Sequence, residues 1–144
     1  MFIGEYTHGI DIKRRLAIPS KFRKELGKRA VISSGPDKCL VLYTENEWSK
    51  VTGRLAGLPT GKPEARAFTR FFLSGAAEVG IDSLGRILIP DILANYAGLK
   101  NEAVLIGVLG RIEIWNKPRW EEYKKKIESS ADELAEKLGE IGAY

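Results

Sequence analysis

An internal repeat constrains this chain of 144 residues more than any other feature of its sequence. Residues 9–19 read GIDIKRRLAIP and residues 80–90 read GIDSLGRILIP, so six of eleven positions are identical at an offset of 71. Further matches keep the same order: Gly27 corresponds to Gly98 and, after a one-residue insertion, Trp48 corresponds to Trp120. This ordered series indicates a duplicated unit of roughly 70 residues. Two unrelated hairpins that share common turn residues are the alternative.

Each half predicts the same order of elements. A strand leads into an Asp-x-x-x-Arg turn, and a second aliphatic strand leaves it. Pro19 or Pro90 ends that strand and suits the first position of a short helix that closes at a glycine. Two further strands and a longer helix follow, and Thr44-x-x-Glu47 is typical of the capping box at the start of such a helix. We expect strands at residues 16–18, 30–33, 39–43, 87–89, 103–108 and 111–115, and helices at 20–26 and 64–72.

Strands this short bury little apolar surface within a unit of roughly 70 residues, so two copies that share one core are more stable than two separate barrels. We therefore expect an α+β, mainly β fold with pseudo-twofold symmetry, in which two ββαββα repeats interleave their hairpins and are flanked by helices. The chain forms a single domain over residues 1–144. Its repeats span about 1–57 and 73–128, a linker and extra helix span about 58–72, and a charged tail spans about 129–144.

Positive charge is concentrated in one segment of the chain. The total of +4 is modest, but residues 13–29 carry eight basic residues against Glu25, a local net charge of +7. The rest of the chain is therefore slightly acidic, at −3. A localised basic excess of this kind indicates a polyanionic partner such as DNA.

The Asp-x-x-x-Arg turns are the candidate contact sites. In such a turn the aspartate can accept backbone N–H groups and pair with the arginine four residues on, which holds a guanidinium at the loop tip. Asp11 and Arg15 form the first copy, with Lys13 and Arg14 between them; three adjacent cations repel one another unless an anion is near. A tip with three cations suits phosphate contact, and arginine can also read guanine edges.

Two parts of this surface have a purely structural alternative. Asp82 and Arg86 form the second copy with a single cation, and this pair resembles a turn lock without a ligand more than the first pair does. Lys21, Arg23 and Lys24 lie on the predicted helix directly after the basic turn, where they either continue a DNA-facing surface or form an ordinary solvated face.

The residue inventory argues against an enzyme and against a metal site. His8 is the only histidine and Cys39 the only cysteine, so a histidine-based triad or a structural zinc site lacks partners. We expect no cofactor and no small-molecule substrate. The longest apolar run, residues 103–110, is too short to cross a bilayer, and the start of the chain does not read as a signal peptide. These features predict a cytoplasmic protein.

Several of these segments together resemble the MraZ family of bacterial transcriptional regulators. They are MFxGEY at Met1–Tyr6, the doubled Asp-x-x-x-Arg-x-x-x-Pro, YAGL at Tyr96–Leu99, and IEIW at Ile112–Trp115 followed by Trp120. The resemblance covers nearly the whole chain. It implies a swapped-hairpin β-barrel of the AbrB/MazE type with both halves in one polypeptide.

The resemblance also implies a function. It points to ring-shaped homo-oligomers, association with the nucleoid, and binding of double-stranded DNA at repeated boxes in the promoter of the division and cell-wall gene cluster. The family's DNA-contact signature falls here on Asp11, Arg15, Asp82 and Arg86. The alternative function is a ring-forming protein-interaction scaffold with non-specific affinity for nucleic acid.

One position departs from the family pattern. The family's first motif usually has a glycine just before the arginine, as Gly85 stands in the second copy, but Arg14 occupies that place here. If the turn requires a positive φ there, a residue with a Cβ costs about 1 kcal/mol. We expect either a locally different turn or a strain that bound DNA offsets.

Overall fold

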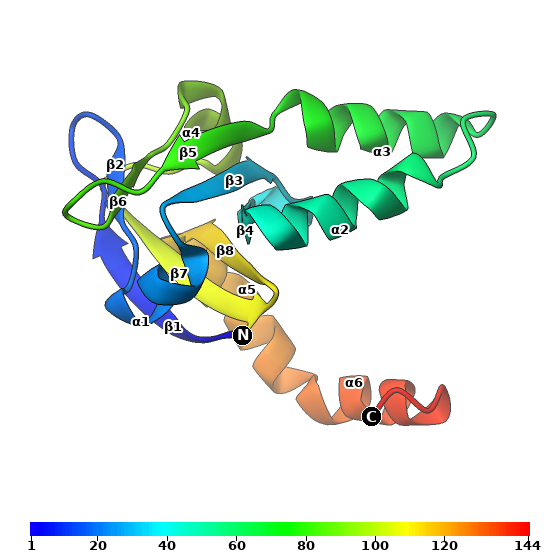
Figure 1. Cartoon of the computed structure of the whole chain (residues 1–144). Coiled ribbons are helices and arrows are strands. Elements are labelled where there is room, and N and C mark those ends of the chain that lie inside the picture. Colours follow the sequence, from blue (N-terminus) through cyan, green and yellow to red (C-terminus); the bar gives the residue numbers. More distant parts are fainter.

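Eight strands and six α-helices make up the fold, which a computed structural model describes for all residues, 1–144 (Figure 1). The strands are β1 (Phe2–Gly9), β2 (Arg15–Ala17), β3 (Arg29–Ser34), β4 (Leu40–Thr44), β5 (Ala77–Gly80), β6 (Arg86–Leu88), β7 (Glu102–Leu109) and β8 (Arg111–Asn116). The helices are α1 (Ser20–Leu26), α2 (Glu45–Ala56), α3 (Pro63–Ser74), α4 (Asp91–Ala97), α5 (Lys117–Ser129) and α6 (Ala131–Glu140), with one short 3-10 turn at Pro36–Lys38.

The two halves of the chain exchange strands. Six strands form one antiparallel sheet in the order β1-β7-β8-β4-β3-β5, and β2 and β6 form a separate two-stranded ribbon. In the sheet, β1 of the first half pairs with β7 of the second, and β5 of the second half pairs with β3 of the first. The mixed α+β, mainly antiparallel class is confirmed. The closed barrel is not, because β1 and β5 remain open edges of the sheet.

Apolar side chains pack against both faces of the sheet. Because side chains alternate along a strand, Leu40 and Leu42 of β4 point into one cluster with α1, α4 and the β2–β6 ribbon, while Val41 and Tyr43 join the other. The second cluster includes the buried Trp115 and Trp120, with partly buried residues of α2, α3 and α5 around it. Strands β4 and β7 therefore read as nearly continuous apolar runs, as strands covered on both faces do, whereas β1 is exposed along most of its length.

The ends of the helices follow the local signals in the sequence, with two differences. Helix α1 has the predicted bounds, but Pro19 and Pro90 lie one residue before the first helical position. Thr44 caps α2, since its Oγ1 accepts the Glu47 N–H at 3.1 Å. The reciprocal half of the capping box does not form, because the Glu47 carboxylate pairs with Lys50 instead.

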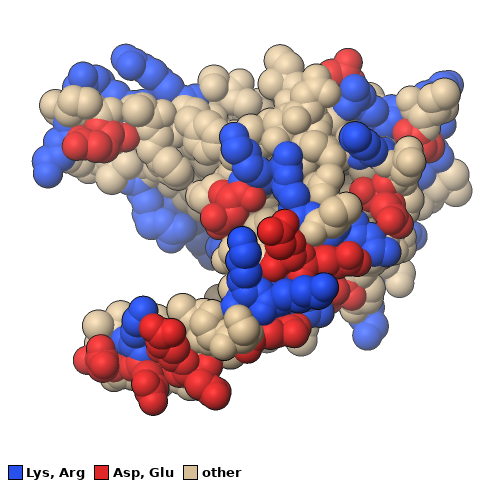
Figure 2. Space-filling model, turned by 180° about the vertical axis from the view of Figure 1, so that it is seen from behind, with Lys and Arg blue, Asp and Glu red and all other residues tan.

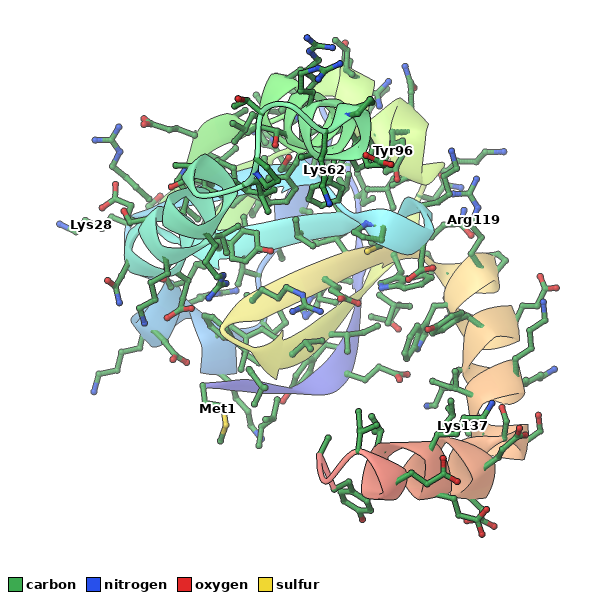
Figure 3. All side chains as sticks on the ribbon, turned by 90° about the vertical axis from the view of Figure 1, so that its right-hand side faces the viewer. Met1, Lys28, Lys62, Tyr96, Arg119 and Lys137 are labelled. Atoms are coloured by element: carbon green, nitrogen blue, oxygen red, sulfur yellow. The ribbon has the colours of Figure 1, made fainter.

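The predicted charged tail contains helix α6. None of its residues is buried, and it extends away from the body of the molecule, as Figure 3 shows around Lys137. Helices α2 and α3 form a second projection, whose connecting turn lies at one end of the molecule (Figure 1). The turns that carry the Asp-x-x-x-Arg motifs lie together at the opposite end (Figure 1).

Candidate nucleic-acid interface

The first Asp-x-x-x-Arg turn is held together by its aspartate. Asp11 Oδ1 accepts the backbone N–H groups of Lys13 and Arg15, both at 2.9 Å, and Oδ2 accepts Nε of Arg15 at 2.6 Å. The Arg15 backbone N–H, followed by its guanidinium, holds the pKa of Asp11 below its usual value. The turn therefore fixes Arg15 through Nε and leaves its two terminal nitrogens without an intramolecular hydrogen bond.

The second turn repeats this geometry. Asp82 Oδ1 accepts the backbone N–H groups of Leu84 and Arg86 at 2.9 Å, and Oδ2 accepts Nε of Arg86 at 2.9 Å. The pKa of Asp82 is lowered in the same way, first by the backbone N–H of Arg86. Because the bonds match one for one, the second turn presents its arginine as the first one does.

The backbone of both turns enters the left-handed region at the same place. Gly85 has φ +76°, and Arg14 has φ +62°. The first turn is therefore not built differently, and Arg14 adopts a conformation that costs a side-chain-bearing residue about 1 kcal/mol. The Arg14 guanidinium lies 2.8 Å from a carboxylate oxygen of Asp91, at the start of α4.

The β2–β6 ribbon places the two motif arginines on one face. Its register pairs Arg15 with Leu88 and Ala17 with Arg86, so these four side chains share the outer face. Leu16 and Ile87 point to the other face and are buried in the core. Arg15 and Arg86 thus lie two residues apart along the ribbon, about 7 Å along the strand axis.

The remaining predicted contact residues are lysines without ion-pair partners. Lys13 is exposed at the tip of the first turn, and Lys21 and Lys24 are exposed on α1 beside the buried Phe22. No carboxylate lies within ion-pair distance of these three lysines, whereas the neighbouring Glu25 pairs with the chain's amino terminus. Their charges are therefore uncompensated within the chain.

Arg23 belongs to the predicted basic face of α1, and the structure places it beside the second turn, a position that was not predicted from the sequence. Its Nε donates to the carbonyl oxygen of Ile18 at 2.8 Å, and its guanidinium lies directly over Gly85. The repeat offers a sequence signal for this contact: at the offset of 71, Arg23 corresponds to Ala94 and Gly85 corresponds to Arg14. Arg23 thus adds a second positive charge to a turn whose own sequence carries one, Arg86.

Negative charge is concentrated elsewhere. Helix α6 carries Asp132, Glu133, Glu136 and Glu140 against Lys137. Figure 2 shows these acidic side chains gathered on the arm that leaves the body, while the face of the body seen there is a mixture of both signs. The chain therefore has a cationic end and an acidic arm.

The structure holds neither a reactive cysteine nor a metal-binding cluster. Cys39 is buried, and burial raises the pKa of its thiol to about 12, so it carries no thiolate nucleophile at neutral pH. No group of three or more His, Cys, Asp or Glu side chains is close enough to hold a metal ion. None of the helices is both long and apolar enough to cross a membrane.

The fold and the site together define a class of protein. It is a duplicated α+β chain with exchanged strands, whose two equivalent turns present arginines from one exposed ribbon. A family model whose description names the MraZ protein and calls it antitoxin-like matches the chain twice, over residues 1–71 and 72–140. The chain belongs to the MraZ family.

Curated relatives agree over the whole length. Proteins named "Transcriptional regulator MraZ" are 47% identical in Acetivibrio thermocellus, 48% in Alkaliphilus oremlandii and 49% in Clostridium tetani. Each match covers 142 residues, 99% of this chain and 99% of the relative. Their name describes a regulator of transcription, which is a non-enzymatic role, and the prediction that the chain is not an enzyme is confirmed.

Proposed function

We propose that this chain regulates transcription by binding double-stranded DNA with the outer face of its β2–β6 ribbon. The observation that carries the proposal is the placement of Arg15 and Arg86 on that single exposed face, each anchored through Nε. The major groove of B-DNA admits a two-stranded β-ribbon. A pair of fixed guanidiniums on such a ribbon can contact base edges or phosphates with little loss of side-chain freedom.

The neighbouring cations suit phosphate contacts. Lys13, Lys21 and Lys24 have no carboxylate partner, so they can neutralise DNA phosphates without first breaking an ion pair. Arg14 already forms an ion pair with Asp91, which partly neutralises the charge that it could offer to a phosphate. In this proposal the arginines of the ribbon carry sequence recognition, and the lysines of the first turn and α1 contribute affinity that falls with salt.

We further propose that the chain acts as a homo-oligomer on repeated promoter boxes in the nucleoid. A ribbon of three residue pairs offers a small contact surface, so a single copy binds weakly. Several linked copies on tandem boxes gain affinity through effective concentration. The family resemblance points to the promoter of the division and cell-wall gene cluster, and to a swapped-hairpin barrel as the unit that assembles.

The test is promoter binding by wild type and Arg15→Ala in a gel-shift assay. The probe is a duplex from the DNA upstream of the chain's own coding sequence. We expect Arg15→Ala to abolish binding while the size of the assembly stays unchanged, and Arg86→Ala to weaken binding because it shares the face. Lys126→Ala, on α5 and paired with Glu122, is the control and should bind as wild type does.

Salt and sequence dependence separate this function from its alternative. Binding should fall with salt by a log–log slope of roughly −0.9 for each phosphate neutralised. Normal binding by a folded Arg15→Ala variant contradicts the proposal. DNA binding that is weakly salt-dependent or blind to sequence, together with a tight protein partner in a pulldown, favours the protein-interaction scaffold instead.

A further inference from the structure

Two pairs of equivalent positions in the repeat each have an arginine in one half and a small residue in the other. At an offset of 71, Arg14 of the first turn corresponds to Gly85 of the second, and Arg23 of α1 corresponds to Ala94 of α4. The turn of one half faces the helix of the other half. In the first turn the arginine is on the turn and the small residue, Ala94, is on the helix. In the second turn the small residue, Gly85, is on the turn and the arginine is on the helix.

The second turn receives its arginine from the helix. Gly85 is buried, and a Cβ added to it would lie 2.3 Å from Cζ of Arg23. The Ile18 N–H donates to the Gly85 carbonyl at 2.8 Å, and the Ile18 carbonyl accepts Nε of Arg23 at 2.8 Å. Ile18 thus holds both groups, and the guanidinium covers the turn just before Arg86.

In the first turn the corresponding arginine is Arg14, a residue of the turn itself. The equivalent bond, from the Ile89 N–H to the Arg14 carbonyl at 3.0 Å, preserves the symmetry of the two halves. The guanidinium of Arg14 lies against Asp91 at the start of α4, and Arg14 and the small residue Ala94 line the same surface cavity. A guanidinium is therefore present beside the motif arginine in both turns.

The electrostatic state of these two guanidiniums differs. Arg14 forms an ion pair with Asp91, whereas no carboxylate lies within ion-pair distance of Arg23, which is anchored by a neutral carbonyl. Charge on Arg23 is thus uncompensated and its two terminal nitrogens have no intramolecular hydrogen bond. Because Gly85 directly precedes Arg86, the guanidinium of Arg23 is a second positive charge at the turn that carries Arg86.

We propose that Arg23 is a DNA-contact residue of the second turn, the counterpart of Arg14 in the first, so that each turn offers the DNA backbone a second guanidinium beside the motif arginine. This inference rests on the proposed DNA-binding function. It also explains Gly85: Arg14 shows that an arginine can adopt the positive φ of this position, so the space taken by Arg23 is what excludes a side chain at Gly85.

The experiment compares single and double variants on the promoter duplex described above. Arg23→Ala and Arg23→Gln should each bind about tenfold more weakly and lose about one unit of the log–log salt slope. Arg23→Gln keeps a side-chain donor for the Ile18 carbonyl and removes the charge. Lys125→Ala on α5 changes the net charge by the same amount and should bind as wild type does.

A swap of the two positions tests the exchange itself. Gly85→Arg alone should destabilise the protein, because the added Cβ collides with Arg23. The double variant Arg23→Ala/Gly85→Arg builds the first turn's arrangement into the second and should recover most of the affinity and the lost salt slope. Thermal unfolding of each variant shows whether a loss of binding follows from a loss of structure.

The outcomes separate the two proposals. Wild-type affinity and salt slope in folded Arg23→Gln, with binding lost in Arg15→Ala, overturns the role of Arg23 and leaves the DNA-binding function standing. Weak binding by the folded double variant also overturns the role of Arg23, because the arginine introduced at position 85 then fails to replace it. Wild-type binding by Arg15→Ala instead overturns the DNA-binding function.

Discussion

Asp11 and Asp82 make the stability of this chain dependent on pH. Their backbone N–H and guanidinium partners lower both carboxyl pKa values in the folded state, so the unfolded chain binds more protons in the ordinary carboxyl range. The resulting stabilisation is complete at neutral pH, where both states are ionised, and is lost as the pH falls through the folded pKa values.

We therefore expect the urea midpoint of the wild type to fall between about pH 5 and about pH 3, and Asp11→Asn/Asp82→Asn to flatten that decline while lowering stability at pH 7. Asp132→Asn, on α6 and outside any ion pair, is the matched control and should follow the wild type. An unchanged pH profile in the double variant would show that the turn carboxylates are not responsible.

At the same scale, the sequence predicts some contacts and misses others. The bond between Asp11 and Arg15 is local, so the spacing of the two residues was enough to predict it. Comparison with Gly85 left two possibilities for Arg14, a positive φ or a locally different turn, and the structure has the positive φ. The position of Arg23 over Gly85 joins residues of different halves, and no local pattern reports such a contact.

The element that ties the two halves together most extensively is β1 against β7. Eight residue pairs run from Phe2 with Leu109 to Gly9 with Glu102. At Gly107 the strands come so close that an added Cβ would lie 2.4 Å from the backbone nitrogen of Ile3. The backbone of β1 cannot move aside as a flexible side chain can, so the pairing of β1 with β7 requires a glycine at position 107.

We expect Gly107→Ala to lower the free energy of unfolding by about 1–3 kcal/mol through overpacking, measured by urea denaturation. Gly53→Ala is the opposite control: it lies inside α2 with open space around it, and alanine should stabilise the helix by about 0.5–1 kcal/mol. Equal stability of Gly107→Ala and wild type would mean that β1 shifts without cost.

Element boundaries were more predictable than element partners. Pro19 and Gly27 bracket α1, and the sequence predicted its bounds as the structure has them. The register of β1 on β7 joins residues about a hundred positions apart, and alternation along a strand specifies which face is buried but not which partner lies beside it. The open edges of the sheet were missed for the same reason.

On the scale of the whole molecule, the cationic turns and the acidic α6 lie far apart. Helix α6 buries no residue, and Leu134, Leu138 and Ile141 remain 45%, 46% and 75% exposed. Exposed apolar side chains gathered on an arm favour contact with another protein surface. The duplicated body carries the proposed DNA contacts, and the exposed apolar side chains of the arm are available to the proposed assembly.

We expect a chain shortened to residues 1–130 to stay folded, because α6 contributes no buried residue to the core. We also expect a smaller assembly in light scattering. The shortened chain should then bind a duplex with one box as wild type does, and lose affinity only on tandem boxes, where linked copies supply effective concentration. A shortened chain of full assembly size would place the contact between copies elsewhere, with the open edges of β1 and β5 as the next surfaces to vary, since each has unpaired backbone groups that a second copy can use.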